Sequence, residues 1–230
     1  MDEIKSINLL YQDEHLVVCD KPVNLPVHKN DFMPHDAPYL TKFLGKTLEK
    51  SIYNVHRLDS KTSGVIVLAL LPEIAKNLSL QFERKEVSKK YLALVKGNPG
   101  KEGTFSENVL IKKKGKKKQA ISHYRTIQTI QTDISYKDIE NVEISLVEIE
   151  TETGRWHQIR QHFAMHRFDI LGDTHHGDWT LNKIITEKTG VKRLFLHASK
   201  LDFYHPLNEK VLSFEAELPK EFDDIIQYFS

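Results

Sequence analysis

The chain has 230 residues, of which 40% are hydrophobic and 28% charged, a composition that is ordinary for a globular protein with a substantial core. Its formal net charge of +1 hides an uneven distribution, because six lysines fall within 112–118 while acidic residues gather in 138–152. The single cysteine, Cys19, excludes an internal disulfide, and the absence of a secretory signal or of a run of roughly 20 apolar residues leads us to expect a cytoplasmic protein.

Short apolar segments separated by turns predict many strands with a few helices between them. The expected strands cover 7–11, 15–20, 65–71, 86–97, 104–111, 119–130, 142–150, 194–204 and 211–217. The expected helices cover 40–48, 72–82, 153–167, 178–190 and 219–229. Because strands and helices do not alternate regularly, we predict an α+β fold with a mixed, mostly antiparallel central sheet flanked by helices and loops.

The stretch 51–70 carries a polar group, His56-Arg57-Leu58-Asp59, followed by Thr62-Ser63-Gly64 and an apolar strand. This order places a cation and a carboxylate at the rim of the core. Taken alone, an arginine two residues from an aspartate is typical of an ion pair at a strand end. The longer pattern HRLDxxTSG resembles the signature of the RluA-type pseudouridine synthases, which isomerise uridine to pseudouridine in RNA.

Three further motifs extend this resemblance over nearly the whole chain. LLYQDEHLVVCDKPVNLPVH, at 9–28, is similar to the start of the family's catalytic domain, with Asn24 at a turn that members commonly build with glycine. GRWHQIRQH, at 154–162, resembles GRxHQIR, and RLFLHAS, at 193–199, matches RLxLHA. The resemblance implies the pseudouridine synthase fold, one catalytic domain over 1–230 without an N-terminal S4-type domain, and chemistry that needs neither a cofactor nor a metal.

The resemblance also assigns roles to individual residues. Asp59 is implied to be the catalytic carboxylate, acting on the sugar as a nucleophile or as a base. Arg57 matches the arginine implicated in flipping the uridine, and Tyr91 matches the active-site tyrosine, although by itself it reads as a half-exposed strand aromatic. Arg160 is implied to pair with Asp59, and Leu196 to line the uracil pocket.

The lysine run KKKGKKK joins two expected strands, and its pattern alone predicts a solvated hairpin tip. Six like charges in seven positions need counterions, which an RNA backbone supplies. We therefore predict phosphate contacts for all six, namely Lys112, Lys113, Lys114, Lys116, Lys117 and Lys118.

The loop GDTHHGDWTLN, at 172–182, resembles the branch of the family that modifies tRNA at position 65 in the acceptor stem. Modification of tRNA at position 32 or of 23S ribosomal RNA is the alternative. The expected partner is therefore RNA, with tRNA preferred, and we expect a monomer with no protein partner and no membrane contact.

The number and clustering of the histidines suggest an alternative function of another class, that of a metal-dependent hydrolase. Six of the twelve histidines lie in 157–197 together with Asp173 and Asp178, at positions 157, 162, 166, 175, 176 and 197. His162 and His166 are one helical turn apart, a spacing that can bind zinc, but no glutamate stands between them as in HExxH. A second rival, an RNA-binding module without activity, is disfavoured because Asp59, Tyr91 and Arg160 occur together.

Overall fold

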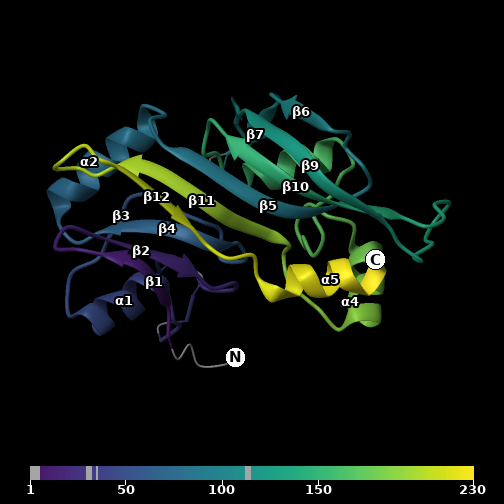
Figure 1. Ribbon diagram of the computed structural model, residues 1–230, viewed down its shortest axis with the longest axis horizontal. Coiled ribbons are helices and arrows are strands. Elements are labelled where there is room, and N and C mark those ends of the chain that lie inside the picture. Colours follow the sequence, from purple (N-terminus) through teal and green to yellow (C-terminus); the bar gives the residue numbers. More distant parts are fainter. Residues whose placement is uncertain (1–5, 30–32, 35, 112–114) are drawn as a thin grey trace. The chain divides into compact units, whose positions relative to one another are not determined.

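A computed structural model describes residues 6–29, 33–34, 36–111 and 115–230 (Figure 1). The chain divides into two units, each of which is described by itself below. The first unit comprises residues 1–89 and 198–217, and the second comprises residues 90–197 and 218–230. The expectation of one catalytic domain over 1–230 remains a prediction.

The first unit is built on a sheet with strand order β1-β2-β4-β11-β12, in which β3 also pairs with β4. Its strands are β1 (Asn8–Gln12), β2 (Leu16–Lys21), β3 (Tyr53–Asn54), β4 (Ser63–Ala69), β11 (Leu196–Tyr204, from Ala198 onward) and β12 (Val211–Glu215). The helices are α1 (Leu40–Leu48) and α2 (Pro72–Glu83), and Pro72 occupies the first helical turn as expected.

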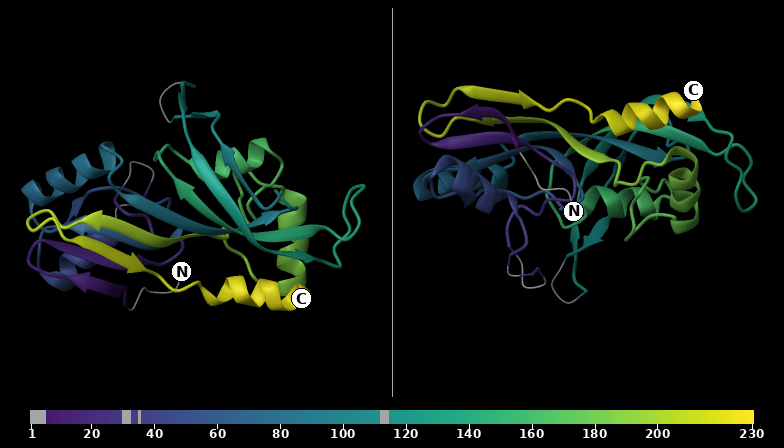
Figure 2. Two further views of the ribbon diagram at one scale, coloured as in Figure 1. Left: turned by 45° about the horizontal axis from the view of Figure 1, so that its top comes forward. Right: turned by 90° about the horizontal axis from the view of Figure 1, so that it is seen from below.

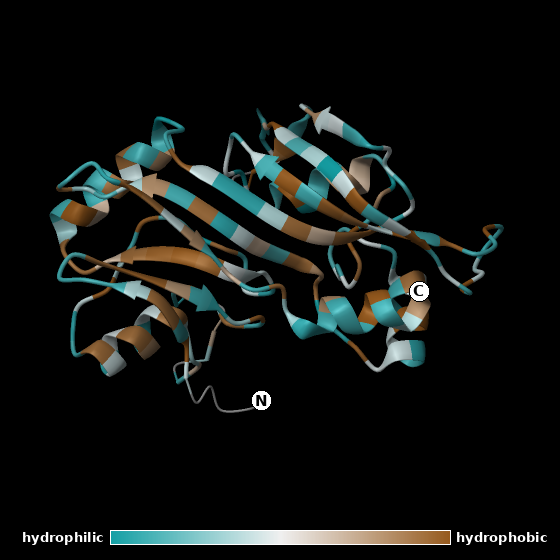
Figure 3. Ribbon diagram, in the orientation of Figure 1, coloured by the Kyte–Doolittle hydropathy of each residue, from teal (hydrophilic) through white to brown (hydrophobic). Residues whose placement is uncertain are grey.

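Strand β4 is buried along all seven residues, and most of its length has the brown colour of apolar residues in Figure 3. Val65 and Val67 pack with Leu16 of β2 and with Leu78 of α2 in the core of this unit. Gly64, at φ 112°, opens the strand, and a Cβ there would lie 2.1 Å from the carbonyl oxygen of Ala198. Only glycine lets the start of β4 approach the β11 backbone this closely.

Two local expectations for the first unit are confirmed. Asn24 adopts the left-handed conformation, with φ 63°, at the turn that the family commonly builds with glycine. Cys19 is fully buried in β2, and burial raises the pKa of its thiol to about 12, so it fills the core and is not poised as a nucleophile.

The second unit contains an antiparallel sheet with strand order β5-β10-β9-β6. Its strands are β5 (Ser88–Lys96, from Lys90 onward), β6 (Glu102–Phe105), β9 (Ser122–Gln131) and β10 (Glu143–Thr151), and a separate hairpin pairs β7 (Asn108–Leu110) with β8 (Lys117–Gln119). The helices are α3 (Gln158–Met165), α4 (Trp179–Thr189) and α5 (Lys220–Phe229). Strands β9 and β10 form a long ribbon within this sheet (Figures 1 and 2).

The expected α+β class with a mixed, mostly antiparallel sheet is confirmed, since every strand pair with a described register is antiparallel. Helix α4 also begins and ends as expected, because the Asp178 carboxylate accepts the backbone N–H groups of Thr180 and Leu181 and Gly190 closes it at φ 72°. Within the described part of the chain, each helix is too short or too polar to cross a membrane.

The strands expected at 104–111 and 119–130 are wrong in extent, because each is broken in two. At the breaks the backbone bonds to the region of α3 instead of continuing the ladder. The Glu107 carbonyl oxygen lies 3.1 Å from His162 Nε2, and the Ile121 N–H donates to Thr153 Oγ1 at 3.1 Å. The helix expected at 153–167 is also shorter, because His157, at φ 49°, forms a left-handed N-cap before Gln158.

Candidate active site

The predicted catalytic carboxylate lies on a short loop of the first unit, between β3 and β4. Leu58 is buried and anchors the loop, leaving Arg57 exposed on one side and Asp59 half-buried on the other. The Thr62 N–H donates to the Asp59 backbone carbonyl at 3.1 Å, which closes a turn immediately before β4. Arg57 and Asp59 therefore stand together at the rim of the core, as the sequence predicts.

His56 fixes the first end of this loop. Its ring stacks on Phe82 of α2 at a centroid distance of 4.4 Å, and its Nε2 accepts the Val67 N–H of β4 at 3.2 Å. Burial, and then the nearby positive charge of Lys89, lowers the pKa of His56 to about 3. His56 is therefore a neutral acceptor near pH 7 and serves as a support for the loop.

Lys21 fixes the second end, a role that sequence reasoning missed. This lysine is fully buried at the end of β2, and its Nζ donates to the carbonyl oxygens of Pro22 and Leu25 at 2.8 and 2.9 Å. It also donates to the carbonyl of Ser60, beside Asp59, at 3.2 Å. A buried ammonium needs several acceptors, and here they tie the 22–25 turn to the Asp59 loop. The signal in the sequence was a lysine ending an apolar strand.

In the second unit, Arg160 lies on α3 with 4% of its surface exposed. Its Nε donates to Asp173 Oδ2 at 2.7 Å and its Nη2 donates to Asp173 Oδ1 at 2.8 Å, a bidentate pair. Asp173 Oδ1 also accepts the backbone N–H groups of His175 and His176 at 2.8 and 3.0 Å. Sequence reasoning named Asp59 as the partner of Arg160 and missed Asp173.

The electrostatics of Asp173 follow from these contacts. Burial by itself would raise the pKa of its carboxyl, but the Arg160 guanidinium and the two backbone donors outweigh burial and hold the pKa at about 2. Asp173 is thus a carboxylate at any physiological pH, and it fixes the guanidinium of Arg160 in one orientation. The pairing of Arg160 with Asp59 remains a prediction, because the two residues belong to different units.

Tyr91 and Leu196 share one apolar cluster of the second unit. Leu196, 4% exposed, packs with Ile159 of α3 and Val147 of β10, and half-buried Tyr91 of β5 packs against the same cluster. The strand face and the helix that carry Tyr91, Leu196 and Arg160 are therefore joined by a common core. The roles of Tyr91 at the flipped base and of Leu196 in a uracil pocket remain predictions.

Two glutamines of α3 connect the motif around Arg160 to the neighbouring strands. Gln158 Oε1 accepts from Thr153 Oγ1 at 2.7 Å, and its Nε2 donates to the Ile121 carbonyl at 2.8 Å. Gln161 exchanges two hydrogen bonds with the backbone of Leu110 in β7. Gln158 of the GRxHQIR motif and Gln161 directly after it thus have structural partners, which sequence reasoning left unassigned.

The lysine run is only partly within the described residues. Lys112, Lys113 and Lys114 lie outside them, whereas Lys116, Lys117 and Lys118 are exposed, the last two in β8. The expected hairpin is confirmed for the β7 and β8 pair, which the Ile111 N–H closes by donating to the Lys116 carbonyl at 2.8 Å. Phosphate contacts by these lysines remain a prediction.

The zinc pair considered for His162 and His166 is not formed. His162 is fully buried, with its ring nitrogens 3.0 Å from Ser122 Oγ and 3.1 Å from the Glu107 carbonyl, and burial lowers its pKa. His166 instead stacks on Phe105 and bonds to the Glu107 carboxylate at 2.8 Å. Both histidines connect α3 to the 105–107 segment, and neither offers an open ligand position.

Comparison with known proteins gives a consistent result. A family model described as RNA pseudouridylate synthase matches residues 15–165, which include Asp59, Tyr91 and Arg160. The tRNA pseudouridine synthase C of Pasteurella multocida (strain Pm70) is 34% identical over 97% of this chain and 96% of that protein. The protein of the same name from Yersinia pestis is 32% identical over 97% of this chain and 91% of that protein.

Solved structures agree with the sequence relatives. Human RNA pseudouridylate synthase domain containing 4 aligns with a TM-score of 0.72 at 27% identity, covering 96% of this chain and 92% of that one. Human RNA pseudouridylate synthase domain containing 1 gives a TM-score of 0.74 over 94% of this chain and 85% of that one, and at 20% identity it shows the shared fold alone. These findings give no support to the metal-dependent hydrolase hypothesis.

Proposed function

The chain belongs to the RNA pseudouridylate synthase family, and on this premise we propose that it converts uridine 65 in the acceptor stem of tRNA to pseudouridine, with Asp59 as the catalytic carboxylate. The observation that carries the choice of tRNA is the 34% identity, over nearly both full lengths, to a protein named tRNA pseudouridine synthase C. Uridine 32 of tRNA and 23S ribosomal RNA are the alternative substrates. We further propose that the protein acts as a cytoplasmic monomer.

The proposed reaction is an isomerisation, so it needs no oxidant, reductant or energy source. The bond between ribose C1′ and uracil N1 breaks, the uracil turns, and C1′ bonds to uracil C5, which then loses its proton while N1 gains one. Asp59 acts at the sugar, either by adding covalently or by removing a proton. The half-buried position of Asp59 at the rim of the core leaves it open to a substrate from solution.

The remaining residues serve the flipped uridine. The target base must leave its stack to reach a carboxylate, and exposed Arg57, beside Asp59 on the same loop, fills or braces the gap. Tyr91 packs against the base, Leu196 lines its pocket, and Arg160 orients the Asp59 carboxylate. Asp173 supports this arrangement through its bidentate bond to Arg160.

The choice of position 65 rests on the loop 172–182, whose residues mostly stabilise the loop itself. Asn182 Oδ1 accepts the Gly172 N–H at 2.7 Å and its Nδ2 donates to the Asp173 carbonyl at 3.1 Å, while Asp178 caps α4. The pattern therefore describes a loop shape, and the proposal is that this shape fits the acceptor stem.

Mapping of pseudouridine at single-nucleotide resolution tests the proposal. Carbodiimide-induced reverse-transcription stops would be compared in tRNA and ribosomal RNA from cells with the gene deleted, complemented with wild type, and complemented with Asp59→Asn. We expect one stop at position 65 of tRNA to disappear on deletion and to return with wild type alone. If the stop that disappears on deletion lies instead at position 32 of tRNA or in 23S ribosomal RNA, that RNA is the substrate in place of uridine 65. If deletion changes none of the stops, the proposed activity is wrong.

The lysine hairpin gives a separate prediction about affinity. Replacing Lys116, Lys117 and Lys118 by glutamine should weaken tRNA binding and reduce the slope of log K against log salt by up to about 3, which is one for each phosphate that a lysine neutralises. Single-turnover rates at saturating tRNA should stay close to wild type. Filter binding at several salt concentrations measures the slope.

A matched control removes three exposed lysines of the first unit, Lys46, Lys50 and Lys76, by the same substitution. This variant has the same net charge, so an equal decrease of the salt dependence in both would show a general charge effect and no specific contact. A large fall in the single-turnover rate of the hairpin variant would instead place the hairpin in the active site.

A further inference from the structure

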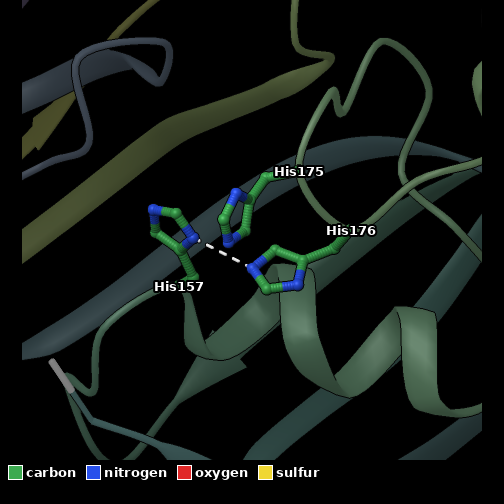
Figure 4. A group of neighbouring side chains, drawn as sticks. All are labelled: His157, His175 and His176. Carbon is green, nitrogen blue, oxygen red and sulfur yellow. Dashed lines mark hydrogen bonds between the residues drawn. The ribbon is translucent and has the colours of Figure 1, made fainter. Parts of the chain in front are cut away.

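Three histidines of the second unit gather in front of helix α3. His157 is the N-cap of α3, and His175 and His176 belong to the loop that follows Asp173. Each of the three offers a ring nitrogen such that all three atoms lie within 4.8 Å of one another, and His157 Nδ1 is 2.9 Å from His176 Nε2. Figure 4 shows the rings turning these nitrogens toward a common point.

The backbone around this cluster is already held in place. Asp173 Oδ1 accepts the N–H groups of both His175 and His176, and the same carboxylate is fixed by Arg160 of α3. The ring of Trp156 stacks on His157 at a centroid distance of 3.9 Å. The backbone that carries these imidazoles is therefore already ordered before a ligand binds, which lowers the entropic cost of binding.

The ligand set selects a class of ion. Imidazole nitrogens suit Zn²⁺, Ni²⁺ and Cu²⁺, whereas Mg²⁺ and Ca²⁺ prefer oxygen. Zn–N bonds of about 2.0 to 2.1 Å in a tetrahedron place neighbouring nitrogens about 3.3 Å apart. His157 Nδ1 and His176 Nε2 are 2.9 Å apart, slightly less than this value, and all three nitrogens lie within 4.8 Å of one another. Small rotations of the rings would therefore bring the three nitrogens to the spacing that a tetrahedral ion requires.

We propose that His157, His175 and His176 form a binding site for one Zn²⁺ ion or a chemically similar divalent transition metal. The ion replaces the proton that His157 and His176 share in the metal-free protein, and water completes its coordination. The ion links the N-terminus of α3 to the 172–177 loop and so adds a second connection to the one that Arg160 and Asp173 make between the same two elements. The site goes beyond the proposed isomerase reaction, and no catalytic step is assigned to the ion.

A second group with metal-ligand chemistry, in the first unit, is less suited. Asp13, His15 and His205 also bring ligand atoms within 4.8 Å of one another. However, His205 Nε2 lies 3.0 Å from Asp13 Oδ2, and its Nδ1 accepts the Leu207 N–H at 3.3 Å. Asp13 also accepts the Tyr11 hydroxyl at 2.9 Å. Metal binding there would compete with the Tyr11 hydroxyl and the Leu207 N–H, two donors outside the ligand set that already use Asp13 Oδ2 and His205 Nδ1.

Calorimetric titration of metal-stripped full-length protein with Zn²⁺ tests the proposal. We expect one equivalent to bind to wild type and to His15→Gln and His123→Gln, but His175→Gln and His176→Gln to bind much more weakly. Loss of an outer-sphere partner usually costs about 10- to 100-fold in affinity, so loss of a direct ligand should exceed that. His123 is an exposed histidine of the same unit that bonds to Glu152, which makes it a matched control.

Tryptophan fluorescence gives an independent readout at the site. The chain has two tryptophans, and replacing the exposed Trp179 by phenylalanine leaves Trp156 as the reporter stacked on His157. Ni²⁺ should quench this emission in one saturable step, and the step should vanish when His175→Gln is added. Absence of binding by wild type at micromolar Zn²⁺ would overturn the proposal. So would binding that survives both His175→Gln and His176→Gln or is abolished in His15→Gln.

Discussion

Asp59→Asn should lower the rate of pseudouridine formation by about 10²-fold or more, while tRNA binding stays close to that of wild type. The amide keeps the size of the side chain and loses both the negative charge and the ability to attack or deprotonate the ribose. Asp59 is half-buried within the loop between β3 and β4, so the substitution leaves the core of β4 intact. Single-turnover assays at saturating tRNA, together with binding measured by filter retention, separate the two effects.

The factor by which Asp59→Asn lowers the rate also helps to distinguish whether Asp59 acts as a nucleophile or as a base. Positioned proton transfer usually contributes about 10²- to 10⁴-fold, whereas removal of a nucleophile from a protease costs about 10⁶-fold. A loss well above the first range would favour a covalent role. The control is Glu73→Gln, which makes the same exchange at an exposed position on α2 and should retain full activity. Activity of Asp59→Asn within tenfold of wild type would contradict the assignment.

The fold was predictable where the apolar pattern and the chain-breaking residues agree. The strand around Val67 reads as an uninterrupted apolar run and is buried along its length, and α4 begins after Asp178 and ends at Gly190 as its caps indicate. Local sequence was insufficient at the breaks before β7 and β9. There the backbone leaves its strand to bond with residues of the α3 region distant in sequence, such as His162 and Thr153.

The candidate site likewise contains residues that the sequence could identify and residues that only the tertiary fold reveals. Arg57 and Asp59 were named as candidates because the longer pattern HRLDxxTSG resembles a family signature, and their loop has the expected place before β4. Lys21 was missed because a single lysine between two apolar segments looks like a surface residue until the carbonyls that surround it are known. Asp173 was missed as the partner of Arg160 because the two lie 13 residues apart on different elements, a pairing that only the tertiary fold creates.

Asp173→Asn should destabilise the protein by about 3 to 5 kcal/mol, because it removes the buried negative charge that two nitrogens of the Arg160 guanidinium contact at 2.7 and 2.8 Å. The two side chains are 1% and 5% exposed, so water cannot replace the broken bonds. The substitution should also lower the catalytic rate, since Arg160 is proposed to orient Asp59. Urea denaturation at pH 7 measures the first effect, and single-turnover rates at a temperature where the variant stays folded measure the second.

Asp133→Asn provides a control with the same substitution and the same 2.7 Å separation from a cation. Asp133 pairs with Lys188, but its side chain is 66% exposed. An exposed pair is screened by water and salt, so the unfolding midpoint should not change measurably. Equal destabilisation by the two variants would show that the effect comes from the exchange of aspartate for asparagine and has nothing to do with burial.

The pKa of Asp173 adds a dependence on pH that distinguishes this pair from a merely steric contact. Its folded value of about 2 lies below the ordinary 3.8, so the stabilisation is complete above about pH 5 and is lost as the pH falls from 4 toward 2. The difference in pKa corresponds to about 2 kcal/mol. Between pH 5 and pH 2 the wild type should therefore lose about this much more stability than Asp173→Asn, which has no carboxyl to protonate. Parallel stability curves for the two proteins over this range would mean that the Asp173 carboxylate contributes no charge interaction to folding.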